Sequence, residues 1–154
     1  MNPVLNGLRR GNKRYSKMNS RPVLRTVDFH GTQISVEFDK GDTKRGVGDY
    51  GEVWENRYDT AAYGEIPNSR TLADGEGLDV YIREEGFDAP MVFVVHQLKR
   101  NGTYDEPKAF LGYQNMGAAI ADYLRYGPKW GFGGCDEMTV DQFLHGYLAS
   151  CRKI

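Results

Sequence analysis

The chain has 154 residues, of which 40% are hydrophobic and 27% are charged, as in an ordinary globular protein of one domain. Its 20 basic and 21 acidic residues nearly balance, so net charge alone does not direct it to nucleic acid or to an anionic membrane. It has no apolar stretch of the signal-peptide or membrane-spanning type, and its two cysteines lack metal-binding spacing. We therefore expect a cytoplasmic protein without membrane contact.

Basic residues are concentrated near the N-terminus. Seven Lys or Arg side chains and no acidic ones occur between Leu8 and Arg25. Residues 1–25 also lack hydrophobic periodicity, which predicts a basic arm ahead of a folded domain over residues 26–154. A charge run of this kind is usually a solvated arm, and less often an element that binds phosphate or docks a partner.

Strands are predicted in the first two thirds of the chain. Apolar residues alternate with polar ones from Gln33 to Phe38, the period of a half-buried strand, and the stretch 40–51 is rich in Gly and charge, as in a hairpin or loop. Further strands are expected at 53–54, at 80–82 and, as a central strand, at 91–96, which pairs with 109–111 across a turn at Asn101–Gly102.

Helices are predicted after the strands. An apolar stripe from Met116 to Leu124 predicts a helix that ends near Gly127–Pro128. Thr139 and Gln142 stand at capping-box spacing ahead of a second apolar stripe and mark the start of another helix. Strands followed by helices predict the α+β class, as a small OB-like, curved β-barrel with two C-terminal helices packed on it.

The acidic segment Asp74-Gly-Glu-Gly-Leu-Asp79 carries the strongest chemical signal. Its three carboxylates converge if the turn folds back on itself, which Gly75 and Gly77 permit. Converging carboxylates repel one another unless a hard cation such as Mg²⁺, Mn²⁺ or Ca²⁺ lies between them. A solvated acidic loop is the plain alternative. An EF-hand is excluded, because Leu78 falls on a ligand position and Asp79 on the required glycine.

The order of motifs resembles that of the soluble (family I) inorganic pyrophosphatases. Tyr63-Gly-Glu-Ile-Pro followed by the acidic segment is similar to the Tyr-Gly-Tyr-Ile and Asp-Gly-Asp-Pro-Val-Asp-Val motifs of that family. Similarity to the pyrophosphatase-like domains of bacteriophage and prophage polyvalent proteins is closer still, through Asp105-Glu106-Pro107-Lys108 and the tail from Gly133-Gly134 to Phe143. Weaker matches are the early Glu37, Lys44, Arg57 and Tyr126.

The resemblance implies metal-assisted hydrolysis of pyrophosphate or a related phosphoanhydride. By that resemblance Asp74, Asp79, Glu76 and Glu106 hold Mg²⁺, or Mn²⁺ in its place, and Glu76 also accepts the proton of the attacking water. The same resemblance assigns phosphate binding and charge neutralisation to Lys44, Arg57 and Lys108. It assigns hydrogen bonds to the phosphates or to the metal ligands to Tyr63 and Tyr126.

Departures from the family pattern leave a second function open. Glu76 and Gly77 stand where the family has Asp and Pro, and Arg100-Asn101-Gly102 replaces a segment with a further metal-binding Asp. These changes, with the basic arm, favour a catalytically degenerate pyrophosphatase-fold protein that binds a protein partner or is a structural component of a phage virion. A nucleic-acid-binding barrel is the least favoured interpretation. If the chain is phage-encoded, we expect it in the host cytoplasm or the virion.

Overall fold

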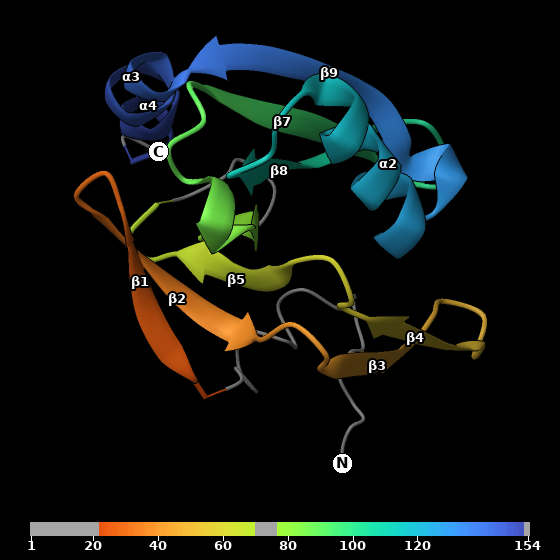
Figure 1. Cartoon of the computed structure of the whole chain (residues 1–154). Coiled ribbons are helices and arrows are strands. Elements are labelled where there is room, and N and C mark those ends of the chain that lie inside the picture. The colour runs from red at the N-terminus through yellow and green to blue at the C-terminus, as the bar shows by residue number, and fades with distance from the viewer. Residues whose placement is uncertain (1–21, 70–76, 153–154) are drawn as a thin grey trace.

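The computed structural model describes residues 22–69 and 77–152. The predicted site residues Asp74 and Glu76, and the predicted arm up to residue 21, lie outside these ranges. Within them the main element is a twisted sheet in the order β1-β2-β5-β6-β8-β7-β9, in which only β6 and β8 run parallel (Figure 1). Its strands are β1 (Arg25–Phe29), β2 (Thr32–Phe38), β5 (Ala62–Ile66), β6 (Leu78–Ile82), β7 (Met91–Leu98), β8 (Tyr104–Leu111) and β9 (Phe132–Thr139).

The sheet is open, so the prediction of a β-barrel is wrong. A barrel needs pairing between its first and last strands, whereas β1 pairs with β2 and β9 with β7. After Thr139 the chain turns into a helix whose Phe143 ring packs against Phe29 of β1, with the ring centroids 6.5 Å apart. The C-terminal helix thus packs against β1, and β9 pairs with β7 instead.

A separate hairpin stands beside the sheet. Its strands β3 (Thr43–Val47) and β4 (Val53–Arg57) pair only with each other in the described residues, in the stretch where the sequence predicts a hairpin or loop. At its turn, Tyr50 is largely exposed and lies against the guanidinium of Arg100, 5.6 Å from the ring centroid. Trp130 flanks the same guanidinium at 4.9 Å.

The two predicted helices are present and lie on opposite faces of the sheet. α2 (Met116–Tyr126) begins at Asn115, whose side chain accepts a hydrogen bond from the Ala118 amide at 2.8 Å. The second helical segment runs through α3 (Val140–Gln142), η3 (Phe143–Tyr147) and α4 (Leu148–Arg152), and its start is closed by the predicted capping box of Thr139 and Gln142. None of the helices in the described ranges is long and apolar enough to cross a membrane.

Each face of the sheet has its own buried cluster. The face under the C-terminal helix is aliphatic, and the face under α2 is mostly aromatic. The aliphatic cluster includes Ile34, Val36, Val80, Val94 and Leu148; the aromatic cluster includes Tyr58, Tyr63, Tyr81, Phe110 and Tyr123. The polar residues considered below lie on the aromatic face.

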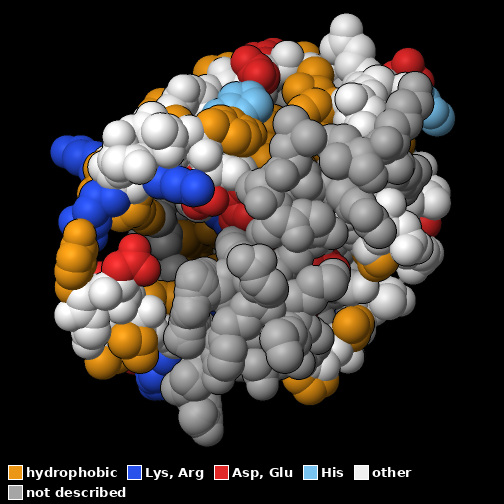
Figure 2. Space-filling model, turned by 180° about the vertical axis from the view of Figure 1, so that it is seen from behind, with side chains coloured by type: hydrophobic (Ala, Val, Ile, Leu, Met, Phe, Trp, Pro, Cys, Tyr) orange, Lys and Arg blue, Asp and Glu red, His pale blue; other side chains and the backbone are white. Residues whose placement is uncertain are grey.

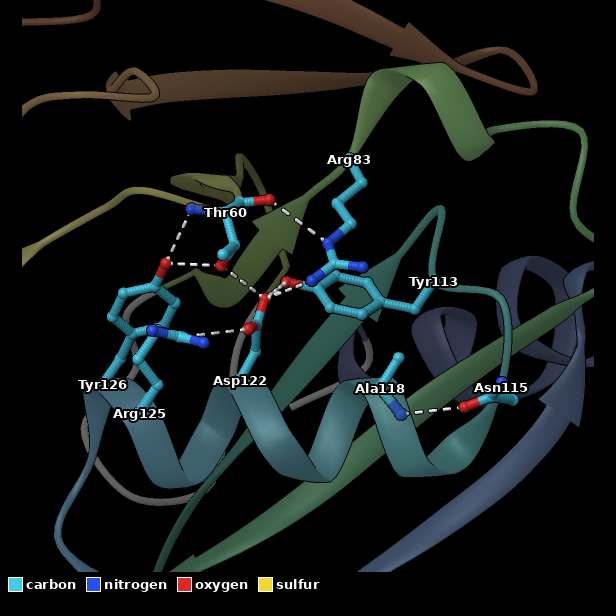
Figure 3. A network of polar contacts seen from close by, with 8 residues as sticks. All are labelled: Thr60, Arg83, Tyr113, Asn115, Ala118, Asp122, Arg125 and Tyr126. Atoms are coloured by element: carbon cyan, nitrogen blue, oxygen red, sulfur yellow. Dashed lines mark hydrogen bonds and ion pairs between the residues drawn. The ribbon is translucent and has the colours of Figure 1, made fainter.

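α2 is joined to the sheet by a buried polar network centred on Asp122 (Figure 3). The Asp122 carboxylate is 3% exposed and accepts hydrogen bonds from Thr60 Oγ1 at 2.8 Å, Arg83 Nη2 at 2.9 Å and Tyr113 Oη at 2.7 Å. The Tyr126 hydroxyl, one turn further along α2, accepts a hydrogen bond from the Thr60 amide at 2.9 Å. These contacts fix the segment that leads into β5.

The N-terminal boundary of the sheet falls inside the predicted arm. Arg25 is the first residue of β1, and its guanidinium binds both oxygens of Asp39, at 2.8 and 3.0 Å, and Glu84 at 2.7 Å. The Leu24 amide also donates to the Val36 carbonyl. The last residues of the predicted arm are therefore joined to the edge of the sheet.

Candidate functional site

Lys108 of β8 is the centre of the polar group on the aromatic face. Its side chain is 9% exposed, and its ammonium donates to Asp79 Oδ2 at 2.9 Å, to Glu106 Oε2 at 2.9 Å and to the Tyr63 hydroxyl at 3.2 Å. Asp79 and Glu106 are 14% and 4% exposed. One cation therefore bridges two largely buried carboxylates contributed by two neighbouring strands.

Strand alternation and register bring these residues together. Leu78, Val80 and Ile82 of β6 enter the aliphatic cluster, so Asp79 projects from the other face. The parallel register places Asp79 beside Lys108, and Glu106 lies two residues before Lys108 on the same face.

The neighbouring strand β5 contributes Tyr63 to the same face. β5 can approach β2 closely because residue 64 is glycine: a Cβ there would lie 1.9 Å from the Ser35 carbonyl oxygen. Gly64 thus allows the close packing of two strands, and the preceding Tyr63 points to the Lys108 cluster.

The charges of the cluster determine the protonation of its members. Burial lowers the pKa of Lys108, but the negative charges of Asp79 and Glu106 outweigh burial, so this pKa lies well above its ordinary value. Burial, with the charge of Asp79, raises the pKa of Tyr63 well above its ordinary value. At neutral pH the cluster therefore presents an ammonium and a protonated phenol.

Lys44 of β3 places a second ammonium near the first. Its Nζ lies 5.2 Å from the ring centroid of Tyr63 and 5.6 Å from that of Phe38. Lys108 Nζ lies 5.7 Å from the same Tyr63 centroid. The Tyr63 ring thus contacts two ammonium groups that arrive from the hairpin and from the central sheet.

Stacked aromatic rings form a wall behind the cluster. Tyr58 stacks on Tyr63 with centroids 5.4 Å apart, and Tyr81 stacks on Phe110 at 4.6 Å. Tyr126 belongs to this wall: it stacks on Tyr81 at 5.6 Å, is only 6% exposed, and directs its hydroxyl to Thr60. The structure therefore places Tyr126 behind the Lys108 cluster, with its hydroxyl in the Asp122 network.

The other predicted site residues are distributed as follows. Arg57 is exposed on β4, and its guanidinium pairs with Asp59 at 2.8 Å. Asp74 and Glu76 fall in the segment that the structure does not describe. The structure thus brings together Tyr63, Asp79, Glu106 and Lys108, and the Lys44 ammonium lies close to the Tyr63 ring.

Two acidic residues on this face, Glu65 and Asp122, were not predicted by the sequence analysis. Glu65 lies two residues after Tyr63 in β5 and is paired in register with Asp79. Strand alternation from Tyr63 was the signal that could have found it. Asp122 had no such signal, because its partners Arg83 and Thr60 are 39 and 62 residues away in the chain.

The donor atoms of the cluster suit a hard cation. Asp79 and Glu106 offer carboxylate oxygens that already flank a positive charge, the Lys108 ammonium. Across residues 22–69 and 77–152, no three side chains of the metal-binding types converge on one point. Figure 2 shows a recess beside the β3–β4 hairpin with acidic side chains on its walls. Mg²⁺ commonly takes one or two protein carboxylates and completes its shell with water and phosphate, so the pair fits it.

Comparison with known proteins gives one match. A family model described as Inorganic Pyrophosphatase matches residues 13–147, which include the whole Lys108 cluster and the Asp122 network. No curated protein and no solved structure matches this chain.

Proposed function

We propose that this chain, which belongs to the inorganic pyrophosphatase family, hydrolyses pyrophosphate or a related phosphoanhydride with the aid of a divalent metal ion, Mg²⁺ or Mn²⁺. The observation that carries the proposal is the bridge of Lys108 between Asp79 and Glu106, with the Lys44 ammonium also close to the Tyr63 ring. A complex of a metal ion with diphosphate has a cation and an anion to be bound. The carboxylates would bind the metal ion, and the two ammonium groups would bind the phosphates.

Asp79 and Glu106 are the described residues that would hold the metal, together with Asp74 and Glu76 on the evidence of the sequence motif. A bound divalent cation would lower the pKa of a water molecule and neutralise phosphate charge. Lys108 and Lys44 would bind phosphate oxygens and balance the negative charge that develops on the leaving phosphate. The buried aromatic wall would keep bulk water from one side of the cluster, which strengthens these electrostatic interactions.

Tyr63 would orient both the substrate and Lys108. Its hydroxyl accepts a hydrogen bond from Lys108, and its raised pKa keeps its own proton available for donation at neutral pH. A phosphate oxygen bound beside the cluster would be a suitable acceptor. Tyr126, by contrast, supports the site through the aromatic wall.

The substitution Asp79→Asn tests this proposal. A neutral amide cannot replace carboxylate charge at a divalent cation, so we expect phosphate release from pyrophosphate to fall at least about a hundredfold. Asp88→Asn is the matched control, because Asp88 is exposed in the turn between β6 and β7. Release is measured with Mg²⁺ after thermal melts have shown that both variants fold. An Asp79→Asn rate equal to that of the control would exclude this site.

We also propose a phage-type protein of the host cytoplasm or virion, supported by the resemblance of Asp105 to Lys108 and of Gly133 to Phe143 to phage domains. A degenerate, partner-binding protein is the second candidate. It is favoured by Arg100, which lies between Tyr50 and Trp130 in the turn where the resembled family carries a further carboxylate.

A further inference from the structure

We infer that the hydroxyls of Tyr58 and Tyr81 are a further part of the substrate site, where they donate hydrogen bonds to a phosphate oxygen of the bound diphosphate. This inference rests on the proposed function, because the diphosphate is the substrate proposed above. It is carried by the burial of the two side chains, by the lack of a partner for their hydroxyls among the described residues, and by their contacts with Tyr63.

Tyr58 is held rigidly at the base of the β3–β4 hairpin. Its amide donates to the Asp42 carbonyl at 2.9 Å, and its carbonyl accepts from the Gly41 amide at 2.7 Å. Its ring stacks on that of Tyr63 with an interplanar angle of 11° and also lies 5.2 Å from that of Tyr126. Because the backbone is bonded and the ring is packed, the hydroxyl has a fixed place in the aromatic cluster.

Tyr81 reaches the same region from β6. It is two residues after Asp79 in the strand, so the two side chains project from the same face. Its ring meets that of Tyr63 edge-on, with the centroids 4.9 Å apart, and lies 6.5 Å from that of Tyr58. Both rings therefore lie against Tyr63, the residue whose hydroxyl accepts the hydrogen bond of Lys108.

Both hydroxyls are buried without a hydrogen bond. Tyr58 is 2% exposed and Tyr81 is 4% exposed. Neither hydroxyl forms a hydrogen bond with another group in residues 22–69 and 77–152, whereas Tyr123 of the same cluster donates to Gln97 at 2.9 Å. A buried hydroxyl that has given up water without gaining a partner is destabilising and is uncommon in folded proteins. The pair therefore indicates a site for a bound polar group.

The charges of the Lys108 cluster act on both hydroxyls. Burial raises the pKa of Tyr58 and that of Tyr81 well above the ordinary value; the charge of Asp79 adds to this rise, and the charge of Lys108 opposes it. Both phenols therefore keep their protons at neutral pH and are available as hydrogen-bond donors beside an ammonium group.

A phosphate oxygen is the acceptor that suits these donors. Protonated phenols and an ammonium together attract an anion rather than a metal ion. A phosphate group carries several oxygens with free lone pairs, so it can accept hydrogen bonds from Lys108 and from both tyrosines at once. In the metal–diphosphate complex, Asp79 and Glu106 would then face the metal, and the two tyrosines would face the phosphate.

Calorimetric binding of imidodiphosphate, a diphosphate with NH in place of the bridging oxygen, tests the inference. The titrations use the full chain with Mg²⁺ and compare the wild type with Tyr58→Phe, Tyr81→Phe and the control Tyr113→Phe. Tyr113 is also fully buried, but its hydroxyl donates to Asp122 at 2.7 Å. We expect Tyr58→Phe and Tyr81→Phe each to weaken imidodiphosphate affinity roughly tenfold and to keep or raise the Tm, because each removes an unpaired hydroxyl. The control should lower the Tm by several degrees and change the affinity less than about twofold.

Wild-type affinity in either Tyr58→Phe or Tyr81→Phe would overturn the inference and leave the proposed hydrolysis standing. A failure of these variants to fold, or a fall in Tm as large as that of Tyr113→Phe, would also overturn it, because the hydroxyls would then be bonded within the protein. If the affinity depends on both hydroxyls but the wild type releases no phosphate from pyrophosphate, the inference holds and the proposed hydrolysis fails. A wild type that does not bind imidodiphosphate contradicts both.

Discussion

Lys108→Met is expected to lower the free energy of unfolding by about 3–5 kcal/mol in metal-free solution and to abolish phosphate release. Methionine keeps the length and apolar volume of the lysine stem but removes the charge. Glu106 and Asp79, which are 4% and 14% exposed, then retain buried negative charge without the cation that bridges them. Urea unfolding followed by fluorescence would measure the loss of stability.

Two further measurements identify the cause of that loss. Lys40→Met, on an exposed lysine after β2, is the matched control and should change stability by no more than about 0.5 kcal/mol. Mg²⁺ or Mn²⁺ should restore part of the stability of Lys108→Met, because a divalent cation would take the place of the ammonium between the carboxylates. Stability losses of equal size in the two variants would show that the Lys108 bridge does not stabilise the fold.

Asp122→Ala is expected to destabilise the protein by about 3 kcal/mol, which corresponds to a fall in Tm of roughly 6–12 °C for a domain of this size. The carboxylate is 3% exposed and accepts hydrogen bonds from Thr60, Arg83 and Tyr113, whose polar atoms would lose a partner (Figure 3). Thermal melts of Asp122→Ala and of the exposed control Asp59→Ala would measure it. The control should lose less than about 1 kcal/mol. A similar Tm in the two variants would show that the Asp122 network does not stabilise the fold.

The Asp122 network is connected to the Lys108 cluster through the aromatic wall. Thr60 holds the Tyr126 hydroxyl, Tyr126 stacks on Tyr81, and Tyr58 lies between Tyr126 and Tyr63, at 5.2 and 5.4 Å. Tyr63 in turn accepts the hydrogen bond of Lys108. The aromatic wall thus connects the Asp122 network to the Lys108 cluster.

The site residues Tyr63, Asp79, Glu106 and Lys108 were predicted from the resemblance of their motifs to the pyrophosphatases, and strand alternation explains why the structure brings them to one face. Asp79 sits between Leu78 and Val80, so burying the apolar pair directs Asp79 to the other face. Lys108 follows Glu106 at the same spacing in β8. The capping residue Thr139 is likewise a local signal, which is why the start of the second helix was predicted correctly.

The rest depends on contacts between distant parts of the chain. β9 was not predicted, because Gly133, Gly134 and Asp136 are poor strand formers, and its structure comes from pairing with β7 at an edge of the sheet. The open sheet follows from where the C-terminal helix packs, which no local pattern records. Tyr126 also depends on a distant contact. Its position near a helix end could be predicted from the sequence, but the direction of its hydroxyl is set by the hydrogen bond with Thr60.

The most direct test of the central claim is phosphate release from pyrophosphate by the purified full chain, with Mg²⁺ and with a chelator. We expect phosphate release in the presence of Mg²⁺, none in the presence of the chelator, and calorimetric binding of Mg²⁺ or Mn²⁺ to the protein without substrate. A chain that releases no phosphate and binds neither cation would contradict the claim. The Lys108 cluster would then stabilise a protein of this family that binds a partner and catalyses no hydrolysis.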